Sequence, residues 1–208
     1  IGHSMGDCKA IYFDDGMSSG YIYGNIIDGC SGRAINIGGG RDMVVRNNLV
    51  LSDVPFSYDC RVGTSTSPEV NWASLYWHVK PGEGLWTTLD RVPYLSDLWR
   101  EKYPNLALIT TDYSRYRDPE FPGNPAYSVV KDNIFIGKFA PLYEDNIDKD
   151  VFEYSEIGLN LTTTKRTDYV DKNTYAVKEG PMEMNRLLNG FEWENIPYEE
   201  IGRYKTEE

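Results

Sequence analysis

One short phrase occurs three times in the first third of the chain, and this repeat restricts the fold more than any other feature. The copies read AIYFDDG at residues 10–16, AINIGGG at residues 34–40 and, more loosely, PFSYDCR at residues 55–61. They lie 24 and then 21 residues apart. Periods between about 20 and 50 residues are typical of proteins in which each copy stacks on the next. The chain is therefore expected to form a repeat architecture.

A second phrase follows the first two copies and returns downstream, as IYGNII at 22–27, VRNNLV at 45–50 and VKDNIF at 130–135. Both phrases alternate apolar and polar residues, and neither has room for a helix of ten residues, so they favour strands. Two or three short strands per period predict an all-β fold, a right-handed parallel β-helix whose equivalent strands stack about 4.8 Å apart. The asparagines that recur in the second phrase, Asn25, Asn48 and Asn133, are interpreted as a structural ladder at a left-handed corner.

The charge balance restricts the partners. The chain has 21 basic and 32 acidic residues, a net charge of −11. Such a surface repels nucleic acid and acidic membranes, and it argues against a polyuronate substrate. No run of 18 apolar residues predicts a membrane span. We therefore expect neither nucleic acid nor a membrane as partner.

The thiols and imidazoles do not predict a metal or cofactor site. The cysteines Cys8, Cys30 and Cys60 lack the two-residue separation of zinc and redox motifs. Cys8 and Cys30 precede equivalent strands and are expected to be small buried residues in neighbouring repeats rather than a disulfide. The only histidines are His3 and His78, too few for a multi-histidine site. No metal and no cofactor are predicted.

The period divides the chain into four segments. Residues 1–61 hold the first repeats, and earlier coils and any secretion signal are expected to precede them. Residues 62–127 form an insertion with four of the five tryptophans and a predicted helix over 93–103. Residues 128–166 resume the repeats. Residues 167–208 are predicted to be a C-terminal cap and tail.

Alternation along the first phrase predicts which residues face outward. If Ile11 and Phe13 face the interior, then Asp14 faces out, and the equivalent positions in the next copies are Gly38 and Asp59. The two aspartates would lie about 10 Å apart, across a glycine. The insertion leaves the repeats directly after Asp59, so it is expected to fold back over this acidic column.

Several stretches resemble those of bacterial right-handed parallel β-helix proteins that act on polysaccharides. They are YFDDGMSSG, YGN, GGRD, NN and YDCR between residues 12 and 61, and the closing stretch 190–202. The nearest family that this resemblance suggests is glycoside hydrolase family 141, which includes α-L-fucosidase and xylanase activities. The resemblance implies two aspartates as catalytic acid and base, at the Asp14–Asp15 pair and Asp59. It also implies a carbohydrate substrate and an extracellular or periplasmic location.

These arguments predict a glycoside hydrolase with an inverting mechanism, because the expected separation of about 10 Å is closer to the 6.5–9.5 Å of inverting enzymes than to the 5–5.5 Å of retaining ones. The predicted catalytic residues are Asp14, Asp15, Asp59 and Asp42. The predicted substrate-binding residues are Arg41, Arg61, Trp72, Tyr76, Trp77 and His78.

Other interpretations remain open at this point. Asp14 and Asp15 suit a tight turn before Gly16, and Arg41 with Asp42 suits either a surface ion pair or a pair that positions substrate. A non-catalytic carbohydrate-binding β-helix would use the acids only as corner caps. A polysaccharide lyase is the third alternative, although it needs a basic column that the sequence does not show.

Overall fold

The structure is a computed structural model, and its described residues are 8–14, 16–60, 86–110, 112–115, 118–122, 124–144, 149–171, 173–180, 183 and 190–200. Within them, most of the regular structure is β-strand arranged in two parallel sheets. The first sheet has the order β1 (Ile11–Phe13), β3 (Ile26–Gly38), β5 (Leu49–Asp59), β7 (Ile134–Ile136) and β10 (Leu161–Thr163), with β8 (Leu142–Glu144) also paired to β5. The second has the order β2 (Tyr21–Tyr23), β4 (Val44–Arg46), β6 (Val129–Lys131) and β9 (Glu156–Ile157).

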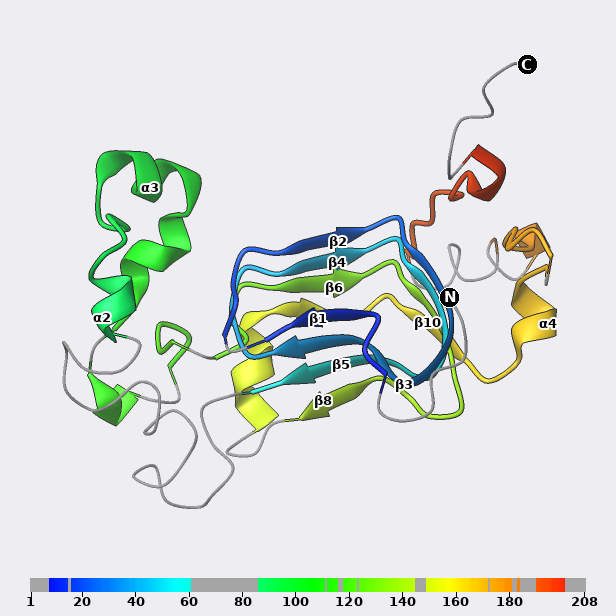
Figure 1. The fold of residues 1–208 in the computed structure, drawn as a ribbon, viewed down its shortest axis with the longest axis horizontal. Coiled ribbons are helices and arrows are strands. Elements are labelled where there is room, and N and C mark those ends of the chain that lie inside the picture. Colours follow the sequence, from blue (N-terminus) through cyan, green and yellow to red (C-terminus); the bar gives the residue numbers. More distant parts are fainter. Residues whose placement is uncertain are drawn as a thin grey trace.

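The helical segments are short and lie beyond the ends of the strands (Figure 1). The segment with α2 and α3 lies beyond one end, and α4 lies beyond the other. Their bounds are α2 Trp86–Leu89, α3 Asp97–Lys102, η2 Pro104–Leu108, η3 Tyr113–Arg115, η4 Lys149–Tyr154, α4 Arg166–Tyr169 and η5 Tyr198–Glu200.

The strand register confirms the alignment of the repeats. Ile11 pairs with Ile35, and Ile35 pairs with Phe56, so the three copies of the first phrase are neighbours in one sheet. In the second sheet Val45 pairs with Val130 across the insertion. The chain alternates between the two sheets at every period, and every strand pair within the sheets is parallel.

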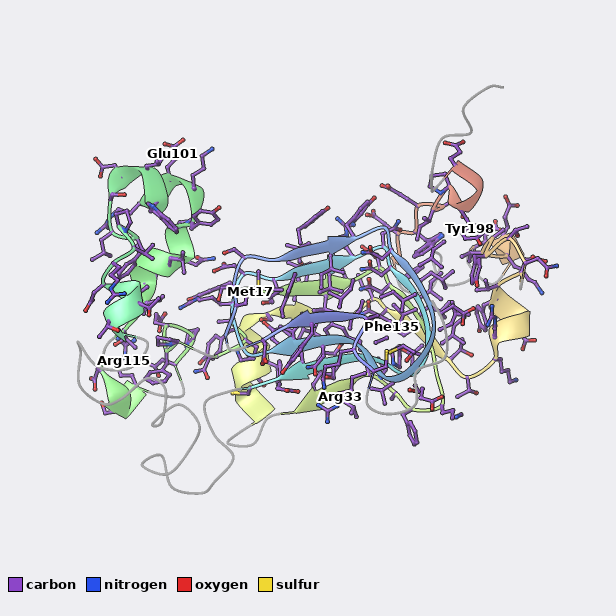
Figure 2. All side chains as sticks on the ribbon, in the orientation of Figure 1. Met17, Arg33, Glu101, Arg115, Phe135 and Tyr198 are labelled. Atoms are coloured by element: carbon purple, nitrogen blue, oxygen red, sulfur yellow. The ribbon has the colours of Figure 1, made fainter. Side chains whose placement is uncertain are left out.

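Apolar side chains fill the space between the sheets. Val45 and Val130 from one sheet and Ile35, Phe56 and Phe135 from the other belong to one buried cluster. Phe135 of this cluster is labelled in Figure 2. Burial of this apolar surface is the main stabilising term of the fold, at about 25 cal/mol per Å².

The outer face of the first sheet carries a second apolar cluster. Leu49, Ile134 and Leu161 point away from the first cluster and pack with Phe191 and Trp193 of the C-terminal segment. Phe191 and Trp193 therefore cover the outer side of three neighbouring strands.

The asparagine ladder is confirmed by hydrogen bonds and has a fourth member, Asn160. The Nδ2 atoms of Asn25, Asn48 and Asn133 each donate to the Oδ1 atom of the next asparagine, over 2.8–2.9 Å. The residue with the left-handed backbone conformation is the one directly before each asparagine. The prediction that the asparagines themselves occupy the left-handed corner was therefore wrong by one residue. The left-handed residues, with φ between 50° and 67°, are Gly24, Asn47, Asp132 and Leu159.

The structure also bears on the predicted helix and on the predicted state of the cysteines. The helix predicted over 93–103 is shorter, from Asp97 to Lys102, and Leu95 and Leu98 are exposed. None of the three cysteines takes part in a disulfide; Cys30 is buried, as predicted, whereas Cys8 is only partly buried. Within the described part of the chain, no helix is both long and apolar enough to span a membrane.

Candidate functional site

The predicted acidic column lies along the end of the first sheet. Gly38 and Asp59 are in register on β3 and β5. Asp14 directly follows β1, whose last residue Phe13 pairs with Ile37, and this places Asp14 beside Gly38. Glu144 on β8 is in register with Asp59 and extends the column by one strand. Sequence reasoning missed Glu144, although LYE at 142–144 has the same pattern as SYD at 57–59.

The two aspartates have different surroundings. Asp14 is exposed, and its Oδ1 accepts a hydrogen bond of 2.5 Å from the Tyr12 hydroxyl. The side chain of Asp59 is only 17% exposed and lies 3.3 Å from Nη1 of Arg33. A guanidinium at this distance stabilises the ionised form of a carboxylate.

Two polar side chains lie on the same face of the first sheet as this column, although both are buried. Asn36 and Ser57 are in register on β3 and β5, and they are 2% and 0% exposed. The Nδ2 atom of Asn36 and the hydroxyl of Ser57 have no hydrogen-bond partner among the residues that the structure describes. A buried polar group without a partner costs about 1–3 kcal/mol, so such groups call for an explanation.

Arg41 is almost fully buried. It is 2% exposed, and its Nη2 atom donates to the Pro119 carbonyl over 2.9 Å. Its guanidinium lies 5.1 Å from the centre of the Tyr127 ring and 3.7 Å from Asp42. Burial lowers the pKa of Arg41, against the opposing effect of Asp42. The prediction that Arg41 contacts substrate is therefore replaced by a structural role: it fixes 119–127 to the sheets.

Asp42 lies at a corner, four residues after Gly38, with a left-handed φ of 55°. Its Oδ1 accepts a hydrogen bond of 2.6 Å from Asn105. Burial raises the pKa of Asp42, while the Asn105 hydrogen bond and Arg41 act in the opposite direction. Asp42 is thus a half-buried anchor for the segment around Asn105, and it is not in register with the acidic column.

The remaining predicted site residues, Asp15, Arg61, Trp72, Tyr76, Trp77 and His78, lie outside the described residues. Among those described, no three histidine, cysteine or acidic side chains are grouped so that they could hold a metal ion. Comparisons of the chain with protein-family models, with curated proteins and with solved structures found no match.

Proposed function

We propose that the two sheets are walls of a right-handed parallel β-helix and that the protein is a glycoside hydrolase. Three observations support the architecture: the chain alternates between two parallel sheets, equivalent strands are in register, and a ladder of four asparagines joins successive repeats. A protein of this kind acts on complex polysaccharides, so an extracellular or periplasmic location is expected.

The observation that carries the functional proposal is the column of Asp14, Gly38 and Asp59. Two carboxylates stand on one face of the sheet with one strand between them. The strand spacing separates their backbones by about 10 Å, and side-chain tilt brings this near the 6.5–9.5 Å of inverting glycosidases. Gly38 between them contributes no side chain, so β3 itself does not fill the space between the two carboxylates.

The proposed reaction gives the two acids different roles. Arg33 favours the ionised form of Asp59, so Asp59 acts as the base that takes a proton from the attacking water. Asp14 donates its proton to the leaving glycosidic oxygen. The anomeric carbon loses its bond to that oxygen and gains one to the water oxygen on the opposite face, which inverts the configuration.

The unpartnered groups of Asn36 and Ser57 suit hydroxyl recognition next to this column. A sugar hydroxyl both donates and accepts hydrogen bonds, and it could pair with both side chains. Both side chains are almost fully covered, at 2% and 0% exposure.

The second candidate is a non-catalytic carbohydrate-binding protein, and the Arg33–Asp59 ion pair favours it. A carboxylate that is 17% exposed and held by a guanidinium can be a purely structural group.

Hydrolysis of a panel of plant-glycan oligosaccharides by the full-length protein separates the two candidates. For a hydrolase, we expect Asp14→Asn and Asp59→Asn each to lower turnover by about 10²-fold or more, the contribution of general acid or base catalysis. Asp97→Asn, an exposed change on α3, is the control. Binding without turnover, unchanged by both column variants, would establish the non-catalytic alternative.

A further inference from the structure

A polar groove of about 460 Å³ lies on the outer side of the first sheet, where four neighbouring segments bend. Its lining comes from residues 28–31, 51–53 and 136–138 and from Thr164 and Arg166, which belong to successive repeats. The volume is within the range of about 300–1,000 Å³ that is usual for small-molecule sites. The predicted catalytic and substrate-binding residues contribute none of the lining.

The charged residues of the groove form two ion pairs. Nη1 and Nη2 of Arg166 donate to the two carboxylate oxygens of Asp28 over 3.2 and 2.8 Å. Nζ of Lys138 lies 2.9 Å from Asp53. The groove therefore contains two acids and two bases and has no formal net charge, whereas the whole chain has a net charge of −11.

The groove is held in a fixed shape by its surroundings. The Tyr175 hydroxyl donates to Asp28 over 2.9 Å, and the Arg166 guanidinium lies 5.7 Å from the Tyr175 ring centre. Gly137 permits a close approach, because a Cβ atom there would lie 2.4 Å from the carbonyl oxygen of Ser52. Polar groups that are fixed before binding lose less entropy when a ligand arrives.

The pattern of donors and acceptors points to a class of ligand. Each ion pair places a cationic hydrogen-bond donor beside a carboxylate acceptor. This arrangement matches a ligand with adjacent hydroxyl groups, because each hydroxyl can both donate and accept a hydrogen bond. Nε of Arg166 is buried and has no hydrogen-bond partner within the described residues, so one donor remains unused. Leu51 and Ile136 also line the groove, but each is only 5% exposed and packs in the second apolar cluster, so the ligand would be recognised mainly by the polar groups.

We propose that this groove binds a segment of a neutral polysaccharide, at a site separate from the acidic column. The proposal rests on the carbohydrate class of the proposed function, and it adds that the recognised chain is uncharged. A uronate chain would meet as many carboxylates as cations in the groove and the excess negative charge of the protein outside it.

The test measures binding by calorimetry with the full-length protein carrying Asp59→Asn, so that turnover does not consume the probe. The probes are neutral cello-, xylo- and mannohexaose, with galacturonate oligomers for comparison. We expect at least one neutral hexaose to bind and the uronate oligomers to bind at least tenfold more weakly. In the double variant Asp53→Ala/Lys138→Ala, affinity for the neutral probe should fall about tenfold or more, because two charge-assisted hydrogen-bonding groups are lost.

A second variant tests the groove without removing charge. Thr164→Trp places a large side chain at the exposed rim and should also abolish binding. The control is the double variant Lys131→Ala/Glu156→Ala, which removes another exposed ion pair outside the groove lining and should bind as the parent does. Melting temperatures of all variants report whether they fold.

The outcomes separate this proposal from the catalytic one. Groove-dependent binding by a protein that hydrolyses no glycan would retain the groove and reject the hydrolase. Hydrolysis that depends on Asp14 and Asp59, together with binding that neither groove variant changes, would overturn the groove alone. Preference for uronate oligomers, or binding to none of the neutral probes, would also overturn it.

Discussion

The side chains of Asn48 and Asn133 are joined by a hydrogen bond of 2.9 Å, although 85 residues separate them in the chain. The backbone N–H of Asn48 also donates to Oδ1 of Asn133. The strands on either side of the insertion are therefore stacked as if the intervening residues were absent. The long insertion leaves and re-enters at one corner and does not disturb the register of the sheets.

The ladder should contribute strongly to stability at its buried centre. Asn48 is 0% exposed and bonds to the side chains of both neighbouring asparagines and to the Ile22 carbonyl. Asn48→Ala leaves several buried groups without partners, so we expect the free energy of unfolding to fall by about 3 kcal/mol. Asn25→Ala, at the partly exposed end of the ladder, should lower the free energy of unfolding by less. Urea unfolding of both variants measures the difference. Equal losses at the two positions would contradict the ladder as the source of the effect.

The glycines at two corners should differ in their tolerance of a side chain. Gly40 has φ of 85°, and a Cβ atom there would lie 2.1 Å from the Met17 carbonyl oxygen. Gly24 has φ of 67° but nothing within 4 Å of a Cβ atom. Gly24→Ala should lower the free energy of unfolding by about 1 kcal/mol through backbone strain. Gly40→Ala should lower it by clearly more, because the clash adds to the strain. Thermal unfolding of both variants measures the difference, and a smaller loss at Gly40 would be inconsistent with the close contact.

Arg41 should stabilise the segment that it anchors. Replacing its guanidinium by the apolar chain of methionine leaves the Pro119 carbonyl and Asp42 without this partner. We expect Arg41→Met to lower the free energy of unfolding by about 3 kcal/mol and to speed amide hydrogen exchange at 118–127. Arg100→Met, an exposed change on α3, is the control. Unchanged exchange over 118–127 would argue against the anchoring role.

Asp42 should make stability depend on pH. Burial raises its pKa in the folded state above the ordinary value, so the folded protein binds this proton more tightly than the unfolded chain does. The contribution of Asp42 to the free energy of unfolding is therefore greatest at low pH and falls as pH rises through the folded pKa. The difference in stability between the wild type and Asp42→Asn should decrease over that interval in urea unfolding. A difference that grows with pH would refute the raised pKa.

The C-terminal segment should stabilise the outer face of the first sheet through Trp193. This side chain is 6% exposed and packs in the cluster with Leu49 and Ile134. Trp193→Ala should lower the free energy of unfolding by about 3–5 kcal/mol. Phe139→Ala removes an aromatic side chain that is 60% exposed and should change it by less than about 0.5 kcal/mol. Similar effects of the two variants would mean that the segment is only loosely docked.

The sequence by itself determined the strands, their register and the ladder. Ile11, Ile35 and Phe56 align because apolar residues must return to the same face at each period, and this requirement is local to each phrase. The asparagines align for the same reason. Asn160 was missed because its phrase, IGLNLT at 157–162, differs most from the others.

Only the tertiary structure decided what covers each outward face. Nothing in the residues around Arg41 indicates that Pro119 and Glu120 accept its hydrogen bonds, or that Phe191 and Trp193 pack on Leu49 and Ile134. The polar groove likewise unites Asp28 and Arg166, which are 138 residues apart. The alternation of apolar and polar residues along a strand predicts only on which face of the sheet a side chain lies. Whether it then meets water or protein depends on distant segments, whose packing is not encoded in any local pattern.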